Sequence, residues 1–423
     1  MKKYLIALLI FPAIIFAQNI NGRISSSAYS FERFDTQNSS ETYIRTFQSL
    51  VLNANEGLFS LRTRLNFETD IANTLDNDPR LRLYNLYLEG RNLFDIANIK
   101  IGRQSLINSV AGGLYDGANL SLKHSGFELS GFYGGNVPAY QKFELTDDFN
   151  NDYVLGGKLV ATALDDFRFA VGYIDKNFKA YEYEAVRLDE DFNPINVLIR
   201  RNSNQYKFIT GEASYVLEDL LEINTSYEYD VNFETTSKIE FAGRYNVMDD
   251  LGVSLYYNHR EPKIRYNSIF SVFNFGNTQE IEGGFDYKID QNFTVTGKFA
   301  NVTYEDDDAQ RLSIGLNSNY GSATYRKTFG YAGELDAVSL YTARTFLDGL
   351  ITPSLGLSYT SYKLSPEEET NNLASVLLGV NVRPWKMLSF DMQGQYMDNK
   401  IYNNDLRLLL KINYWFNTNL SVL

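Results

Sequence analysis

Charged side chains recur at every second position along parts of the chain, a spacing that gathers them on one face of an extended strand. Arg62 and Arg64 share such a face with Asn66 and Glu68, between residues that are apolar or carry a hydroxyl group. Side chains two residues apart in a strand point to the same side. Guanidinium and carboxylate groups arranged in this way attract or repel ions, so the spacing predicts charge selection rather than bond-breaking chemistry.

The candidate residues fall into two groups. One group, rich in arginine, comprises Arg62, Arg64, Arg82, Arg103 and Asp116. The other consists of the carboxylates Glu222, Glu228, Asp230 and Glu240. If the groups face each other across a water-filled space, they create a transverse electric field; otherwise they form a solvated polar wall. Arg103 also has two interpretations, a charge at the narrowest point or a wall arginine paired with Asp116.

Catalytic chemistry has few candidate residues. The chain has two histidines and no cysteine, which removes thiolate nucleophiles, disulfides and cysteine-based metal sites. His124 falls in a predicted turn, and His259 could share a strand face with Glu261. No nucleophile motif accompanies them, so we expect no enzyme, with a membrane hydrolase as the remote alternative.

Several acidic clusters raise the question of calcium binding, because carboxylates are the oxygen ligands that this ion prefers. They are Asp147-Asp148 with Asn150, Asn151 and Asp152, then Asp189-Glu190-Asp191, and Glu305-Asp306-Asp307-Asp308. None has the spacing of an EF-hand loop. We therefore expect no metal and no cofactor, but solvated loop charge that divalent ions could bridge to lipopolysaccharide. The excess of 52 acidic over 39 basic residues also argues against nucleic acid as a partner.

Strands of roughly ten residues must position these side chains. In the segment 221–231, Leu221, Ile223, Tyr227 and Tyr229 alternate with polar residues. Elsewhere Val171 and Phe241 belong to apolar faces, with Ala170 and Ala242 on the opposite faces. Amphipathic helices would need apolar residues three and four apart, which these segments lack. The chain therefore predicts an all-β protein.

The lengths of the connections indicate a transmembrane antiparallel barrel. Longer connections, such as 137–152, 178–204 and 261–279, alternate with shorter ones. The shorter connections are predicted near 54–57, 91–96, 124–126, 163–166, 217–220, 248–250, 289–292, 320–321, 347–350 and 384–388. Long extracellular loops and short periplasmic turns are typical of outer-membrane barrels. The count is about 22 strands, within a working range of roughly 16 to 22.

The N-terminus has the pattern of a cleaved secretory signal. Lys2 and Lys3 precede an apolar stretch that ends at Phe16, and Ala17 supplies the small residue expected at a cleavage site. We therefore predict a signal peptide over 1–17 and one barrel domain over 18–423. The first strand is expected near Arg23, which leaves no room for the plug domain of a TonB-dependent transporter.

One motif resembles a known group of proteins. The segment Ile101-Gly102-Arg103-Gln104 is followed by a loop and then by Gly112-Gly113-Leu114-Tyr115-Asp116-Gly117-Ala118-Asn119-Leu120. This Gly-Arg-Gln and Asp-Gly-Ala pattern resembles porin-like outer-membrane barrels of the alginate-export type and related bacterial porins. The resemblance covers residues 99–122 and implies passage of solutes, without indicating which solute.

The expected function is therefore an outer-membrane channel in a Gram-negative-type envelope that passes small hydrophilic solutes or ions. A substrate-specific channel and a barrel sheath around a multihaem cytochrome are the alternatives. Membrane lipid and lipopolysaccharide are the expected surroundings, and homo-oligomerisation is left open.

Overall fold

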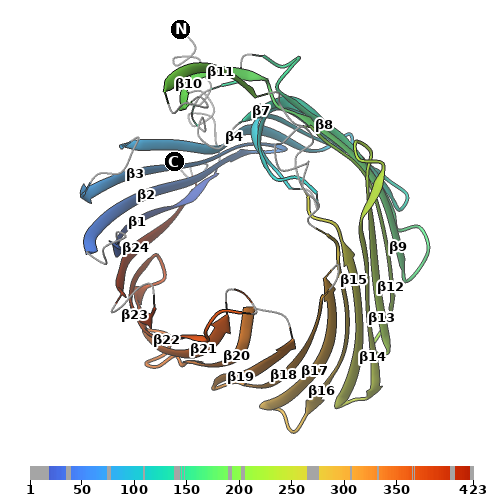
Figure 1. Ribbon diagram of the computed structural model, residues 1–423. Helices are drawn as coiled ribbons and strands as arrows, with labels where there is room; N and C mark the ends of the chain where they lie inside the picture. The colour runs from blue at the N-terminus through green and yellow to red at the C-terminus, as the bar shows by residue number, and fades with distance from the viewer. Residues whose placement is uncertain are drawn as a thin grey trace.

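The computed structural model forms a single closed sheet of 22 strands (Figure 1). It describes residues 19–34, 40–73, 78–107, 110–137, 143, 145–146, 148–188, 193–201, 205–263, 276–304, 307–330, 333–363, 365, 367–400 and 405–419. Each strand pairs antiparallel with its neighbour in the sequence, apart from β9, which pairs with β12. The best strand count from the sequence is therefore confirmed.

The strands have the following bounds. The first part of the barrel comprises β1 (Asn19–Phe34), β2 (Ser40–Glu56), β3 (Phe59–Ala72), β4 (Arg80–Leu93), β5 (Ala97–Leu106), β6 (Gly113–His124), β7 (Phe127–Val137), β8 (Tyr153–Ala161) and β9 (Phe167–Asn177). The middle part comprises β12 (Gln205–Leu217), β13 (Leu221–Asp230), β14 (Thr235–Met248), β15 (Leu251–Arg260), β16 (Thr278–Lys288), β17 (Phe293–Tyr304) and β18 (Asp307–Ser318). The last part comprises β19 (Gly321–Gly330), β20 (Gly333–Ala343), β21 (Ile351–Lys363), β22 (Asn371–Trp385), β23 (Leu388–Asn399) and β24 (Asp405–Asn419).

The barrel closes where its first and last strands meet. β1 and β24 are antiparallel and in register from the pair Asn19 and Asn419 to the pair Ser30 and Leu408. Closure gives every wall strand two hydrogen-bonded neighbours, which matters in lipid because each unpaired backbone group costs several kcal/mol there.

The two faces of the wall differ as the period-two pattern predicts. The outer face carries exposed apolar side chains on strand after strand, including Val171 at 60%, Leu378 at 60% and Leu410 at 53% exposure. Charged and amide side chains alternate with them on the inner face. An apolar exterior around a polar interior is the surface of a barrel that spans a membrane. Among the described residues, no helix is long and apolar enough to cross a membrane.

The connections follow the predicted alternation of lengths only in part, because two residues separate β17 from β18 and β19 from β20, both predicted to be longer connections, whereas seven separate β20 from β21. All ten connections predicted to be shorter lie at one end of the barrel, for example the turns between β6 and β7 and between β14 and β15. One longer connection holds an unexpected element, because β10 (Tyr181–Leu188) and β11 (Pro194–Arg201) pair as a separate antiparallel hairpin within 178–204 (Figure 1).

A hydrophobic patch interrupts the polar inner face on β8, β9 and β12. Val154, Ile174 and Phe208 have inward-facing positions but are at most 1% exposed. Leu106 and Ala111, at the two ends of the β5–β6 connection, belong to the same buried cluster. Part of this connection therefore lies inside the barrel, which strand alternation alone did not predict.

Candidate functional site on the inner wall

The predicted arginines of β3 and β4 lie on the inner wall, where two of them meet carboxylates. Arg62 Nε is 3.0 Å from Glu89 Oε2, and Arg82 Nε is 3.3 Å from Glu68 Oε1. Arg64 instead lies over the ring of Tyr84, with its Cζ atom 5.4 Å from the ring centroid. Among the described residues no carboxylate lies within ion-pair distance of Arg64, so its charge is the least compensated of the three.

The same sector contains charged residues that the sequence did not single out. Arg45 on β2 binds Asp70 at 2.6 Å, and Arg80 reaches Asp70 and Glu68 at 3.9 and 3.7 Å. Lys100 on β5 lies 3.6 Å from Glu89. Strand alternation could have placed each residue on the inner face. Their pairing depends on the strand register, which the sequence does not reveal.

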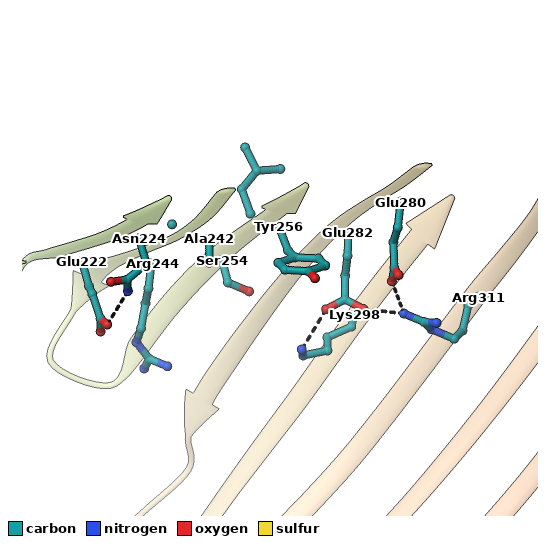
Figure 2. Close-up of a pocket in the computed structure, with 12 residues that line it drawn as sticks. Glu222, Asn224, Ala242, Arg244, Ser254, Tyr256, Glu280, Glu282, Lys298 and Arg311 are labelled. Atoms are coloured by element: carbon teal, nitrogen blue, oxygen red, sulfur yellow. Dashed lines mark hydrogen bonds and ion pairs between the residues drawn. The ribbon is translucent and has the colours of Figure 1, made fainter. Parts of the chain in front are cut away.

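A recess of about 420 Å³ marks the inner wall of β13 to β18 (Figure 2). Nine of its twelve lining residues are charged or polar; the lining comprises Glu222, Asn224, Ala242, Gly243, Arg244, Ser254, Leu255, Tyr256, Glu280, Glu282, Lys298 and Arg311. Figure 2 shows the labelled polar side chains of this lining in a row across neighbouring strands. The row forms because every second residue of each strand faces inward.

An ion-pair network occupies one side of this recess. Glu282 accepts hydrogen bonds from Lys298 at 2.8 Å and from Arg311 at 3.1 Å, and Arg311 also donates to Glu280. Each charge therefore has an opposite partner, and this part of the wall offers hydrogen bonds with little net charge.

The other side of the recess is different. Glu222 and Arg244 are opposite each other in the strand register, yet they do not pair. Arg244 binds Asp286 at 2.7 Å, whereas Glu222 accepts a hydrogen bond from Asn224 at 2.8 Å. Among the described residues Glu222 has no ion-pair partner, so it presents a carboxylate to the lumen.

Glu240 also faces inward, next to the recess residue Tyr256. It lies 3.0 Å from Lys238 and accepts a hydrogen bond from the hydroxyl of Tyr256 at 3.2 Å. Seen along the barrel, β3 and β14 lie on opposite sides (Figure 1). The arginine-rich and carboxylate-rich groups thus belong to different sectors of the wall, but pairing within each sector weakens the field between them.

The burial of Arg103 decides whether it is a charge at the narrowest point of the lumen or a wall arginine paired with Asp116. The Arg103 side chain is 1% exposed, and its Nε and Nη2 atoms both bind the Asp116 carboxylate at 2.7 Å. Strand alternation also places Arg103 on the side of Ile101, which is 55% exposed on the outer face. Solutes in the lumen cannot reach this pair, so the geometry supports a structural ion pair in the wall.

Two of the predicted acidic pore residues are also buried. Glu228 is 2% exposed and lies 2.6 Å from Lys263 Nζ. Asp230 is 7% exposed and accepts hydrogen bonds from the backbone N–H groups of Asn232 and Phe233. Both carboxylates hold connections in place, which leaves Glu222 and Glu240 as the accessible members of that group.

The remaining candidates show no catalytic or metal-binding arrangement. His259 is opposite Ile239 in the register, on the outer face, and His124 ends β6 beside the turn to β7. No group of metal-binding side chains occurs in the described part of the chain.

The two described carboxylates of one acidic cluster, Asp148 and Asp152, form hydrogen bonds with side chains of the protein. Hydrogen bonds from Asn151, with Lys179 at 3.4 Å, hold the pKa of Asp148 below its usual value. Burial raises the pKa of Asp152. Asp147, residues 189–191 and residues 305–306 lie outside the described residues.

Comparisons with known proteins give a likeness of fold. No family model matches the chain, and no curated protein does. The FrpB iron transporter from Neisseria meningitidis superimposes with a TM-score of 0.57 at 11% identity, over 94% of this chain and 82% of that one. OccK5 from Pseudomonas aeruginosa gives a TM-score of 0.46 at 11% identity, over 95% and 99% of the two chains. Because the sequence identity is only 11%, the superposition with FrpB shows a shared fold, that of a large β-barrel, and nothing more.

Proposed function

We propose that this protein is an outer-membrane porin that passes small hydrophilic solutes or ions. The observation that carries the proposal is a closed 22-stranded wall with an apolar exterior and a charged interior. Barrels of about 16 or more strands are too wide for inward side chains to fill, so an unplugged lumen holds water. In the described residues, the chain forms wall strands, connections and one hairpin, with no separate domain in the lumen.

The inner wall suits hydrophilic cargo. Its ion pairs provide hydrogen-bond donors and acceptors along the strands, and Arg64 and Glu222 add uncompensated charges in different sectors. A solute that leaves bulk water can exchange hydration for these groups at little cost. The recess on β13 to β18 also supports the second candidate, a channel with a preferred solute.

Finer assignments follow from the sequence. The motif around Arg103 and Asp116 supports kinship with the alginate-export type among porin-like barrels. We assign 1–17 to a cleaved signal peptide and 18–423 to the barrel. We infer contact with lipopolysaccharide at the end with longer connections, and the apolar exterior is the surface through which copies of the chain would meet in a homo-oligomer.

Liposome swelling tests the proposal. Vesicles that contain the refolded protein should swell in isotonic solutions of small sugars and more slowly as the sugars grow. Vesicles that contain heat-denatured protein provide the control. Absence of swelling with correctly folded protein would refute the porin function.

A further inference from the structure

The Gly-Arg-Gln and Asp-Gly motif surrounds one buried ion pair. Arg103 on β5 and Asp116 on β6 are register partners at the end with longer connections. Besides its two bonds to Asp116, Arg103 donates from Nη1 to the carbonyl oxygen of Leu83 at 3.4 Å. Two parallel bonds between planar groups fix the relative orientation of the two strands.

The glycines of the motif allow this approach. Gly102 has a φ angle of +128°, and a Cβ atom there would lie 2.3 Å from the carbonyl oxygen of Leu86. At Gly117, a Cβ atom would lie 2.1 Å from the carbonyl oxygen of Tyr133. Glycine therefore allows neighbouring strands to come close beside the ion pair.

The described part of the β5–β6 connection meets the inner wall of β8, β9 and β12, which lie two to four strands further round the barrel than β6. Ala111 is 6% exposed within the cluster that includes Val154, Ile174 and Phe208. Lys176 Nζ on β9 donates to the carbonyl oxygen of Gly112 at 2.7 Å. Without this cover, the patch would expose hydrophobic surface to a water-filled lumen.

We propose that Gly102, Arg103, Asp116 and Gly117 form a clasp that holds residues 110–112 of the β5–β6 connection on this patch and fixes the width of the lumen there. Arg103 is then a positioning residue and not a charge filter. A buried ion pair suits this role, since it contributes more to a defined geometry than to net stability. The width argument rests on the proposed porin function, whereas the seating of the connection does not.

Cysteine labelling tests the seating, because the chain has no native cysteine. Cysteine introduced by Ala111→Cys should react slowly with a small thiol reagent in the folded barrel. Adding Arg103→Ala should make it react quickly. Arg62→Ala, which breaks an ion pair on the open wall, is the matched control and should leave Ala111→Cys protected. Asn224→Cys, on the exposed inner wall, should react quickly in every background.

Lys176→Met provides a second variant, because it removes the hydrogen bond to Gly112 and leaves the Arg103–Asp116 pair in place. It should also speed labelling of Ala111→Cys. Continued protection in folded Arg103→Ala and Lys176→Met barrels would overturn the clasp.

Conductance separates the clasp from the porin function. In 1 M KCl the Debye length is about 3 Å, so charge effects on conductance are largely screened. Arg103→Ala should then alter the unitary conductance, and Ile101→Ala, which shortens an outer-face side chain on the same strand, should not. Faster labelling in a protein that forms no channel would refute the porin function and leave the clasp intact; normal conductance despite faster labelling would refute the control of width.

Discussion

At the scale of residues, wall ion pairs differ in burial. The Arg103 and Asp116 side chains are 1% and 10% exposed, whereas Arg62, paired with Glu89, is 36% exposed. Removing one partner of a buried ion pair leaves the other charge buried without compensation. At an exposed pair, water can solvate the charge that remains, so the loss of stability is small. Sequence alone offered both interpretations of Arg103, because strand alternation does not measure burial.

This difference predicts unequal losses of stability. Arg103→Ala should lower the free energy of unfolding by about 3–5 kcal/mol, the usual cost of a lone buried charge. Arg62→Ala should lower it by about 1 kcal/mol or less. Reversible urea unfolding in lipid vesicles measures both. Similar losses for the two variants would show that the Arg103 pair is accessible to water.

Uncompensated charges should control ion preference. Arg64→Ala should shift the reversal potential towards cations, and Glu222→Gln should shift it towards anions. The unmodified channel should prefer cations weakly, because the formal net charge of the chain is −13. Salt at 1 M should diminish all three effects, since the Debye length falls from about 10 Å at 0.1 M to about 3 Å. Strong anion preference in the unmodified protein would contradict the argument from net charge.

At the scale of elements, alternation makes each strand face predictable. Val171 lies on the outer face and Ala242 on the inner face, as the sequence predicts. Val171→Arg near the bilayer midplane should cost about 2–4 kcal/mol, and Ala242→Arg much less. Ala170 is a poor control although it faces inward, because it is only 3% exposed. The same unfolding assay measures these costs, and equal costs at Val171 and Ala242 would mean that the faces are assigned wrongly.

Closure gives a second prediction for elements. Deletion of β24 (Asp405–Asn419) would leave β1 and β23 with unpaired edges in lipid. Each unpaired backbone group costs several kcal/mol there, so the truncated chain should not form the compact barrel. Loss of the heat-sensitive shift in gel migration would show this. A truncated protein that keeps the shift would contradict closure through these strands.

Strand number and faces were predictable because a period of two recurs along the chain and turns interrupt it regularly. Three features were not predictable. The hairpin of β10 and β11 lies within a predicted loop, and the patch around Ile174 and Phe208 reverses the polarity of the inner face. Both features depend on how the segments between wall strands pack. Such segments show no regular alternation of apolar and polar residues from which their contacts could be predicted. The third is the pairing of inner charges such as Arg45 with Asp70, which requires the register.

At the scale of the whole molecule, the apolar exterior and closed wall predict where the protein is found. It should fractionate with the outer membrane, give a β-type circular dichroism spectrum in detergent and migrate faster on gels before boiling than after. Recovery as a soluble species that needs no detergent would contradict a membrane barrel.

The most direct test is the conductance of single molecules in a planar lipid bilayer. The unmodified barrel, folded by the gel-shift criterion, should produce discrete current steps of uniform size. Their conductance should rise with salt concentration, as expected for a water-filled lumen. Insertion of folded protein without current steps at any salt concentration would contradict the proposed channel.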